Sequence, residues 1–383
     1  MSVMTGRERV LAALHRRRPD RVPIDLGGTK NSSIHIVAYE RLKRYLGISV
    51  PTQPRLADRM MQIVDIDEVV LQRLDVDTRA VYEGSPDRPR GRIIDPDTYA
   101  DEWGVVRRKV PGGYSYDLLH SPLSGEITAA DIANYPWPDP LDPGILRPIV
   151  PRIERLRHTD CALVLHLPSA FVHKSQYLMG FEDWFLNIAL NPSLLGSLFD
   201  AILEVSMAQA EQLLDAAGHL VDVVNVADDI ADQRGPIVSP PAYRKLIAPR
   251  LLAYFEFIRA RTSAPILYHT CGSLYEIMHD LVALGVQALN PVQVNARDMD
   301  IARLKRAYGD QVAFWGAVDT QKVLPFGTPE DVRTEVRQRI CDLGPGGGYV
   351  LAAVHNIQPE VPPENIVAMI EAAREFGVYE TAS

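Results

Sequence analysis

The chain of 383 residues is poor in cysteine, with only Cys161, Cys271 and Cys341. An odd and sparse set of this kind cannot form a disulfide framework, which favours a reduced, cytoplasmic compartment. No apolar run approaches the roughly 18 to 20 residues that a membrane span needs, and the first residues are polar. We therefore expect neither a signal peptide nor a membrane anchor.

Positive charge is also in deficit, because 40 Lys and Arg residues face 49 Asp and Glu residues, for a net charge of -9. The basic residues are scattered rather than gathered in one arm, which argues against nucleic acid or an anionic membrane as a partner. No GxSxG, Walker or dinucleotide fingerprint occurs in a suitable context. This absence disfavours serine hydrolase, nucleotidyl and nicotinamide chemistry.

What the sequence does contain is a series of short runs rich in Val, Ile and Leu, separated by helical patterns that often end at Gly. Such continuous apolar runs are typical of parallel strands that are buried on both faces. The eight candidate strands begin at Val22, Leu74, Cys161, Asp222, Ala264, Val286, Val312 and Tyr349.

Strands that alternate with helices predict a parallel sheet, and eight such units fit an α/β fold of the (β/α)8 TIM-barrel type. An open, doubly wound sheet is the structural alternative. The segment from about 81 to 142 is rich in Pro, Gly and charge, and it predicts a small β-rich excursion inserted after the second strand. We expect one domain that spans residues 1–383.

Polar residues follow every one of the eight runs, and the C-terminal ends of barrel strands are where active sites form. They are Asp25, Asp77 with Arg79, His166, Asp228 with Asp229, His269 with Cys271, Asn290 with Gln293, Asp319, and His355. A residue at a strand end is often just the N-cap of the next helix, but that explanation covers all eight ends poorly. The pattern predicts an acidic pocket that contains imidazoles and binds a small molecule.

Within this set, we expect Asp228, Asp229 and His166 to be catalytic. The expected substrate contacts are Asp25, Asp77, Arg79, Asn290, Gln293 and Asp319. For Asp228 and Asp229, a strand-end cap with a salt bridge to Arg234 is the structural alternative.

The sequence Tyr268-His-Thr-Cys-Gly272 carries the sharpest motif. Residues two apart on an extended strand point to the same side, so His269 and Cys271 can reach one ion. A thiolate with an imidazole suits Zn²⁺ better than Mg²⁺ or Ca²⁺. His355 is the leading candidate for a third ligand, and an Asp or an open position would be the fourth. The alternative is that Cys271 is a small buried hydrophobe and His269 a hydrogen-bonded core residue.

Several longer segments resemble the uroporphyrinogen decarboxylase superfamily: RERVLAALHRRRPDRVPIDLGG, DDIADQRGPIVSPPAYRKLIAPRL, YHTCGS, FWGAVDTQKVLPFGTPEDV and HNIQPEVPPENI. The resemblance extends over nearly the whole chain and implies a (β/α)8 barrel, in agreement with the strand count. The true decarboxylases carry a motif resembling RQAGRYLPEY that grips the porphyrinogen carboxylates. Here that stretch reads LGGTKNSSIHIVAYERLKRYLG and offers few cations beyond Lys30, so porphyrinogen decarboxylation is not expected.

The second branch of the superfamily comprises cobamide-dependent methyltransferases, some of which hold zinc with a His-x-Cys pair and a later Cys. His269 and Cys271 match the pair, whereas His355 stands where the later Cys is found. The resemblance thus implies a zinc-dependent methyltransferase with a methylcobamide co-substrate on a corrinoid partner protein. A neutral imidazole in place of a thiolate makes zinc a stronger Lewis acid. The resemblance leaves open whether His355 binds zinc or substrate.

Two other functions are compatible with these residues. A decarboxylase or other zinc-assisted lyase would use Asp228 and Asp229 to hold or protonate a carbanion-like intermediate, with His355 or His166 as the acid. A corrinoid or porphyrinoid binding module would bind without turnover. The superfamily includes monomers and dimers, so a homodimer is allowed.

Overall fold

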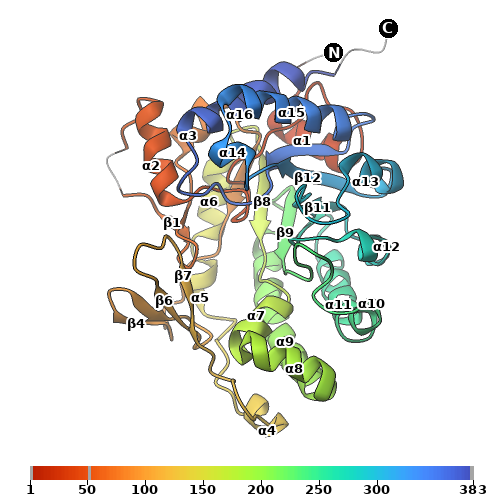
Figure 1. The fold of residues 1–383 in the computed structure, drawn as a ribbon. Helices are drawn as coiled ribbons and strands as arrows, with labels where there is room; N and C mark the ends of the chain where they lie inside the picture. Colours follow the sequence, from red (N-terminus) through yellow and green to blue (C-terminus); the bar gives the residue numbers. More distant parts are fainter. Residues whose placement is uncertain (1–2, 51–52, 380–383) are drawn as a thin grey trace.

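A computed structural model describes residues 3–50 and 53–379, and its centre is a curled sheet of seven parallel strands (Figure 1). In spatial order these strands are β13 (Tyr349–Ala353), β12 (Ala313–Val318), β11 (Ala288–Asn290), β10 (Ile266–His269), β9 (Val223–Ala227), β8 (Ala162–His166) and β3 (Thr78–Val81).

The strands are buried on both faces, which explains their continuous apolar sequences. Successive side chains still alternate. On β8, Ala162 and Val164 belong to a small cluster inside the curl of the sheet, while Leu163 and Leu165 belong to the larger core under the helices. Helix α1 (Gly6–Leu14) contributes Val10 to the inner cluster and so fills one end of the sheet's interior.

The expectation of eight strands is corrected to seven within the described residues. The run at Val22 forms no strand, and Ile24 makes a single parallel bridge to Leu351 of β13. Pro23 has no N–H to donate, and the N–H of Ile24 goes to the Asp77 carboxylate rather than to a strand. The segment nevertheless bonds to both edges of the sheet, because Leu351 N–H donates to Pro23 O and Asp77 N–H to Ile24 O.

Helices surround the sheet (Figure 1). After α1 they are α2 (Ile36–Tyr45), α3 (Glu68–Arg73), α4 (Ala129–Ala133), α5 (Pro143–Leu146), α6 (Ile149–Leu156), α7 (Val172–Met179), α8 (Phe181–Leu190), α9 (Pro192–Ala217), α10 (Pro240–Ala242), η1 (Tyr243–Ile247), α11 (Ala248–Arg259), η2 (Tyr275–Ile277), α12 (Met278–Ala283), α13 (Ile301–Tyr308), α14 (Val323–Phe326), α15 (Pro329–Leu343) and α16 (Pro363–Phe376). Local signals fix several ends: Thr328 and Asp331 form a capping box before α15, and Pro329 occupies its first position.

Two smaller antiparallel sheets complete the structure. Strands β1 (Leu56–Asp58) and β2 (Ile63–Val64) pair with each other. Between β3 and β8 the chain forms a four-stranded sheet of β4 (Arg92–Asp95), β5 (Thr98–Ala100), β6 (Val106–Lys109) and β7 (Tyr116–His120). This sheet extends away from the parallel strands in Figure 1. None of the described helices is long and apolar enough to cross a membrane.

Candidate metal centre

The inward-facing residues change from apolar to polar towards the C-terminal ends of the central strands. On β10, Leu267 lies in the inner apolar cluster and His269, two residues later, points the same way. The pair Ala288 and Asn290 repeats this order on the neighbouring strand β11. A polar layer therefore covers the apolar interior at the end of the sheet where active sites form.

The hydrogen bonds of His269 define which ring nitrogen is available. Its Nδ1 lies 2.5 Å from Asn290 Oδ1, while Asn290 Nδ2 donates to Trp315 O at 3.1 Å. Because the amide oxygen only accepts, Nδ1 carries the proton and Nε2 keeps its lone pair. Asn31 Nδ2 donates to that lone pair at 3.0 Å, and an ion bound there would replace this hydrogen bond.

Cys271 lies beside the free nitrogen of His269, with its Sγ 3.5 Å from Nε2. A tight turn follows it, because Gly272 has φ +101° and a Cβ at that position would lie 2.5 Å from Asp232 O. Burial raises the pKa of the Cys271 thiol well above its usual range, and the Asp229 carboxylate raises it further. A bound divalent cation has the opposite effect and would favour the thiolate.

His355, directly after β13, completes a cluster of three. One ligand atom each from His269, Cys271 and His355 lie within 4.8 Å of one another. Burial, together with the neighbouring His269, lowers the pKa of His355 to about 4, so the ring is neutral near pH 7. A neutral imidazole is the form that binds a metal.

The donor set fits a zinc ion. With Zn–S near 2.3 Å and Zn–N near 2.05 Å, tetrahedral angles place a coordinating nitrogen and sulfur about 3.6 Å apart. The observed separation of His269 Nε2 and Cys271 Sγ is 3.5 Å. Two neutral imidazoles and one thiolate leave one tetrahedral position for Asp229 or a substrate atom.

Asp229 borders this cluster. Its Oδ1 accepts the N–H of Cys271 at 2.8 Å and lies 3.9 Å from His269 Nε2, while its Oδ2 lies 3.6 Å from His173 Nδ1. Burial opposes ionisation of Asp229. The imidazoles of His269 and His173 outweigh burial and lower the pKa of its carboxyl. Asp229 is therefore an anion next to the thiol of Cys271.

Asp228 points the other way and holds a helix. Its carboxylate accepts the backbone N–H groups of Phe171, Val172 and His173 at 2.7 to 2.8 Å, at the start of α7. Neither Asp228 nor Asp229 forms an ion pair with Arg234 among the described residues. The two adjacent carboxylates thus connect α7 with the metal-ligand cluster.

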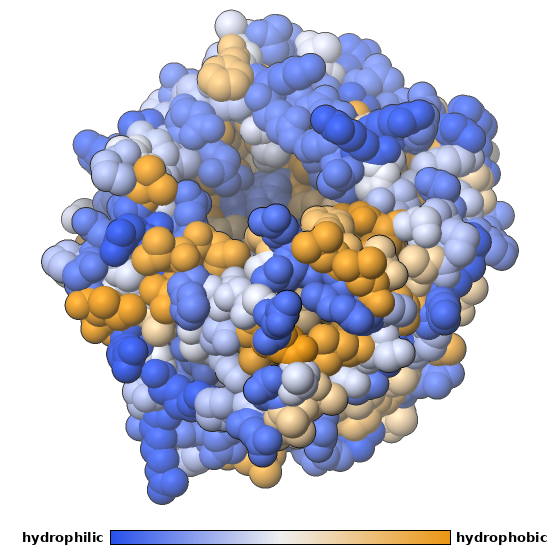
Figure 2. Space-filling model, turned by 60° about the horizontal axis from the view of Figure 1, so that its bottom comes forward, coloured by the Kyte–Doolittle hydropathy of each residue, from blue (hydrophilic) through white to orange (hydrophobic). Residues whose placement is uncertain are grey.

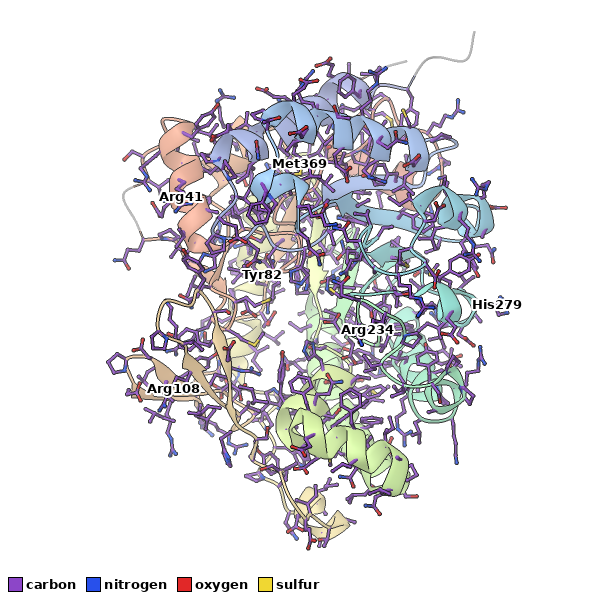
Figure 3. All side chains as sticks on the ribbon, in the orientation of Figure 1. Arg41, Tyr82, Arg108, Arg234, His279 and Met369 are labelled. Atoms are coloured by element: carbon purple, nitrogen blue, oxygen red, sulfur yellow. The ribbon has the colours of Figure 1, made fainter. Side chains whose placement is uncertain are left out.

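His166, at the end of β8, lies within a buried polar group whose other members the sequence did not predict to be its neighbours. Burial lowers its pKa to about 3, and its ring packs against Tyr82 with centroids 4.7 Å apart. Lys30 and Glu83 form a 2.7 Å ion pair nearby. Figure 3 shows Tyr82 near the centre of the molecule.

Two of the predicted substrate contacts lie away from this end of the sheet. Asp77 lies at the N-terminal end of β3 and binds Arg9 and Arg21, so its expected place at the C-terminal end of a strand is wrong. Arg79 turns outward and pairs with Glu68 of α3 at 2.8 Å. The run from Leu74, predicted to be one strand, is shorter in the structure, because Leu74 is the C-cap of α3 and β3 begins at Thr78.

Two predicted acids have structural partners. Asp25 is buried and accepts hydrogen bonds from the Thr78 hydroxyl and the Trp315 indole. Asp319 accepts the side-chain amide of Asn295 at 2.7 Å and the backbone N–H of Gln321 at 2.7 Å. Both therefore hold strand ends and the loops that follow them.

A cavity of about 400 Å³ opens beside the ligand cluster. Cys271, His355 and Gln293 line it, and the buried Oδ1 of Asn356 has no hydrogen-bond partner among the described residues. Gln293 also accepts the N–H of Gly272 at 2.7 Å. Figure 2 shows a hollow with hydrophilic residues in its depth on the face that lies at the bottom of Figure 1.

Sequence reasoning missed Asn31, His173 and the pair Lys30–Glu83. Asn31 and Lys30 follow a Gly-Gly turn, and a polar run after the first apolar segment was the available signal. The position of His173 depends on how α7 packs over the strand ends, which no local pattern encodes.

Comparisons with known proteins identify the family of this chain. The profile of the uroporphyrinogen decarboxylase (URO-D) family matches residues 122–376. The uroporphyrinogen decarboxylase of Alkalilimnicola ehrlichii is 25% identical over 393 aligned positions, covering 98% of this chain and 95% of the relative. The methylcobamide:CoM methyltransferase MtaA of Methanosarcina barkeri is 27% identical over 183 residues, which are 47% of this chain and 49% of MtaA.

A solved structure of a methyltransferase from Methanosarcina mazei superposes with a TM-score of 0.66 at 19% identity, and it covers 97% of this chain and 99% of the other. At that identity the likeness establishes the fold alone. The family match covers well over half of the chain. The chain belongs to the uroporphyrinogen decarboxylase family.

Proposed function

We propose that this chain is a zinc-dependent methyltransferase, which moves a methyl group between a methylcobamide carried by a corrinoid protein and a small acceptor or donor. The observation that carries the proposal is the convergence of His269, Cys271 and His355 within 4.8 Å. A decarboxylase that needs no metal has no use for a thiol clustered with two imidazoles. The match to the methyltransferase MtaA over about half of each chain supports the same function.

The proposed roles follow from the contacts. His269 and Cys271 hold the ion, and Asn290 fixes the ring of His269 so that Nε2 faces it. Bound zinc would lower the pKa of an acceptor or polarise a leaving heteroatom. Asp229, which accepts the backbone N–H of Cys271 and lies 3.6 Å from His173 Nδ1, would hold Cys271 beside the ion or occupy the remaining ligand position.

The barrel architecture is part of this proposal. Pro23 and Ile24 bond to both edges of the seven-stranded sheet, which supports a closed (β/α)8 barrel. In that arrangement residues 1–383 form one domain, and the sheet of β4 to β7 is an insertion after the second barrel strand. Asp228 acts as a positioning residue for α7, and His166 with Gln293 faces the substrate.

The second candidate is a decarboxylase or another lyase of the same family. It is favoured by the 25% identity to a uroporphyrinogen decarboxylase over 98% of this chain. In this function Asp229 or His166 would protonate the intermediate, and Lys30 would bind a substrate carboxylate. It predicts turnover by the purified chain without any corrinoid.

Metal analysis tests the first candidate. Purified protein loaded with Zn²⁺ and dialysed should retain about one zinc per chain, whereas Cys271→Ala and His355→Ala should each lose most of it. Cys341→Ala is the matched control, because Cys341 is exposed on α15 and should leave the zinc content unchanged.

A spectral assay separates the two candidates. Methylcob(III)alamin should lose its methyl group in the presence of the enzyme and a thiol, with a change in its visible spectrum, and Cys271→Ala should abolish this. A zinc-free wild type, or no methyl loss with any thiol or folate, contradicts the methyltransferase.

A further inference from the structure

A second cavity, of about 310 Å³, lies between the four-stranded sheet and α7. We call it the aromatic cavity, because Tyr99, Trp103 and Tyr177 line it together with Lys174 and Arg107. Tyr99 and Arg107 come from β5 and β6, and Lys174 and Tyr177 come from α7. Its volume is near the lower end of the usual range for ligand pockets, about 300 to 1,000 Å³, so a single-ring molecule fits.

Each aromatic ring in this cavity meets a cation. Lys174 Nζ lies 4.2 Å from the Trp103 ring centroid, and the Arg107 guanidinium lies 4.1 Å from that of Tyr177. At the exposed rim, Arg59 lies 4.2 Å from the Tyr99 ring. The cations thus rest on flat π surfaces in a partly desolvated space.

The side chain of Arg107 lies on the buried face of β6. Its side chain is 6% exposed, whereas that of the next residue, Arg108, is 54% exposed. Figure 3 shows Arg108 on the four-stranded sheet, away from the centre of the molecule. Strand alternation therefore directs one arginine of the pair into the cavity and the other into solvent.

The acids of the cavity are already engaged. Asp101 accepts the backbone N–H groups of Trp103 and Val105 at 3.0 Å and faces Arg107 at 3.5 Å. Asp58 accepts the N–H of Met61 at 2.7 Å. No carboxylate of residues 3–50 and 53–379 lies within ion-pair distance, 4.0 Å, of Lys174 Nζ.

Lys174 therefore has no ion-pair partner within 4.0 Å among the described residues, and burial lowers its pKa to about 8 although the more distant carboxylates of Asp228, Glu83 and Asp101 favour its charged form. It still carries its charge near pH 7. An ammonium in a desolvated, aromatic site gains most from an anion that enters the same space. The Tyr177 ring is already covered by Arg107 and by His173, so Tyr99 and Trp103 are the aromatic walls against which an aromatic ligand can pack.

Helix α7 connects this cavity with the metal-ligand cluster. His173, the neighbour of Lys174, stacks on Tyr177 with centroids 4.6 Å apart. The same His173 faces Asp229 at 3.6 Å, and Asp229 accepts the N–H of Cys271. One turn of helix, anchored by Asp228, thus borders both sites.

We propose that the aromatic cavity binds a small aromatic carboxylate, with the carboxylate at Lys174 and the ring against Tyr99 and Trp103. Its role as the substrate that reacts at the neighbouring metal centre rests on the proposed function, whereas its binding does not.

Benzoate is the probe, and its binding to the full chain is measured by titration calorimetry and by the fluorescence of Trp103, with Trp103→Phe identifying that signal. Wild type should bind benzoate at least about tenfold more tightly than neutral benzamide or non-aromatic cyclohexanecarboxylate. Lys174→Met should weaken benzoate binding about tenfold or more, and Lys174→Arg should restore most of it. Lys245→Met, on the outer surface, is the matched control and should bind as wild type does.

Thermal unfolding of each variant establishes that it is folded. The proposal is overturned if benzoate does not bind at millimolar concentration, if benzamide binds equally well, or if Lys174→Met binds as tightly as wild type. Cys271→Ala keeps the two proposals apart, because it should lose zinc and methyl transfer while its affinity for benzoate stays within about twofold of wild type.

Discussion

Asn290 does not line the cavity beside the ligand cluster, but it controls the orientation of His269 in the candidate metal centre. It touches no ion in the proposed site, but its amide oxygen accepts the Nδ1 proton of His269, and its amide nitrogen is held by Trp315 O. Partners of this kind orient a ligating imidazole and raise its basicity. Asn290 therefore determines which tautomer His269 presents to the cluster.

Replacement of Asn290 by Ala should lower the affinity for zinc about 10- to 100-fold, because His269 can then protonate Nε2 or rotate. Competition with a chromogenic chelator measures the dissociation constant. Asn134→Ala, at the exposed end of α4, is the control and should bind zinc as wild type does. Unchanged affinity in Asn290→Ala would show that Asn290 does not orient the ligand.

His166 gives the fold a dependence on pH. Its pKa is about 3 in the folded protein because of burial, against about 6.5 for an unfolded histidine. Between these values the unfolded chain binds one more proton, so stability falls as the pH drops from 6.5 towards 3.

Urea unfolding of wild type and His166→Gln at pH 7, 6 and 5 tests this dependence. Below pH 6.5 the wild type should lose up to about 1.4 kcal/mol per pH unit more than the variant does. His279→Gln replaces an exposed histidine and should follow the wild type. Parallel curves for wild type and His166→Gln would contradict a neutral, buried His166.

At the scale of elements, seven of the eight apolar runs are strands. A buried parallel strand needs apolar side chains on both faces, so its sequence is a continuous apolar run that can be recognised without the structure. The run at Val22 looked the same. This run does not form a strand, because Pro23 lacks an N–H and because the Asp77 carboxylate, distant in sequence, accepts the N–H of Ile24. The second effect arises only once the chain has folded.

The candidate site likewise combines residues that a local sequence pattern places together with residues that only the folded chain brings together. His269 and Cys271 are two residues apart on one strand, so a local rule suffices to place them together. His173 and Lys174 reach the site because Asp228 fixes the start of α7 over the strand ends. This contact joins residues 55 positions apart, and nothing in the sequence near Lys174 distinguishes it from a surface lysine.

Across the whole molecule, one end of the parallel sheet carries buried ion pairs and the other carries the candidate ligand sites. At one end, Asp77 is 3% exposed and joins three parts of the chain, through Arg9 of α1, Arg21 and the N–H of Ile24. At the other end lie the cluster around Cys271 and both cavities. Residues at the first end should govern stability, and residues at the second should govern ligand binding.

Asp77→Asn tests this separation. Loss of the buried charge leaves Arg9 and Arg21 without their shared partner, so the free energy of unfolding should fall by about 3 kcal/mol or more, measured by urea denaturation. Zinc content and benzoate affinity of the folded variant should equal those of wild type. Asp200→Asn, which breaks an exposed pair with Arg250, should cost less than about 1 kcal/mol. Cys271→Ser should show the reverse pattern, with zinc lost and the stability of the metal-free protein nearly unchanged. If Asp77→Asn loses zinc while its stability stays that of wild type, the two ends of the sheet are not separate in function.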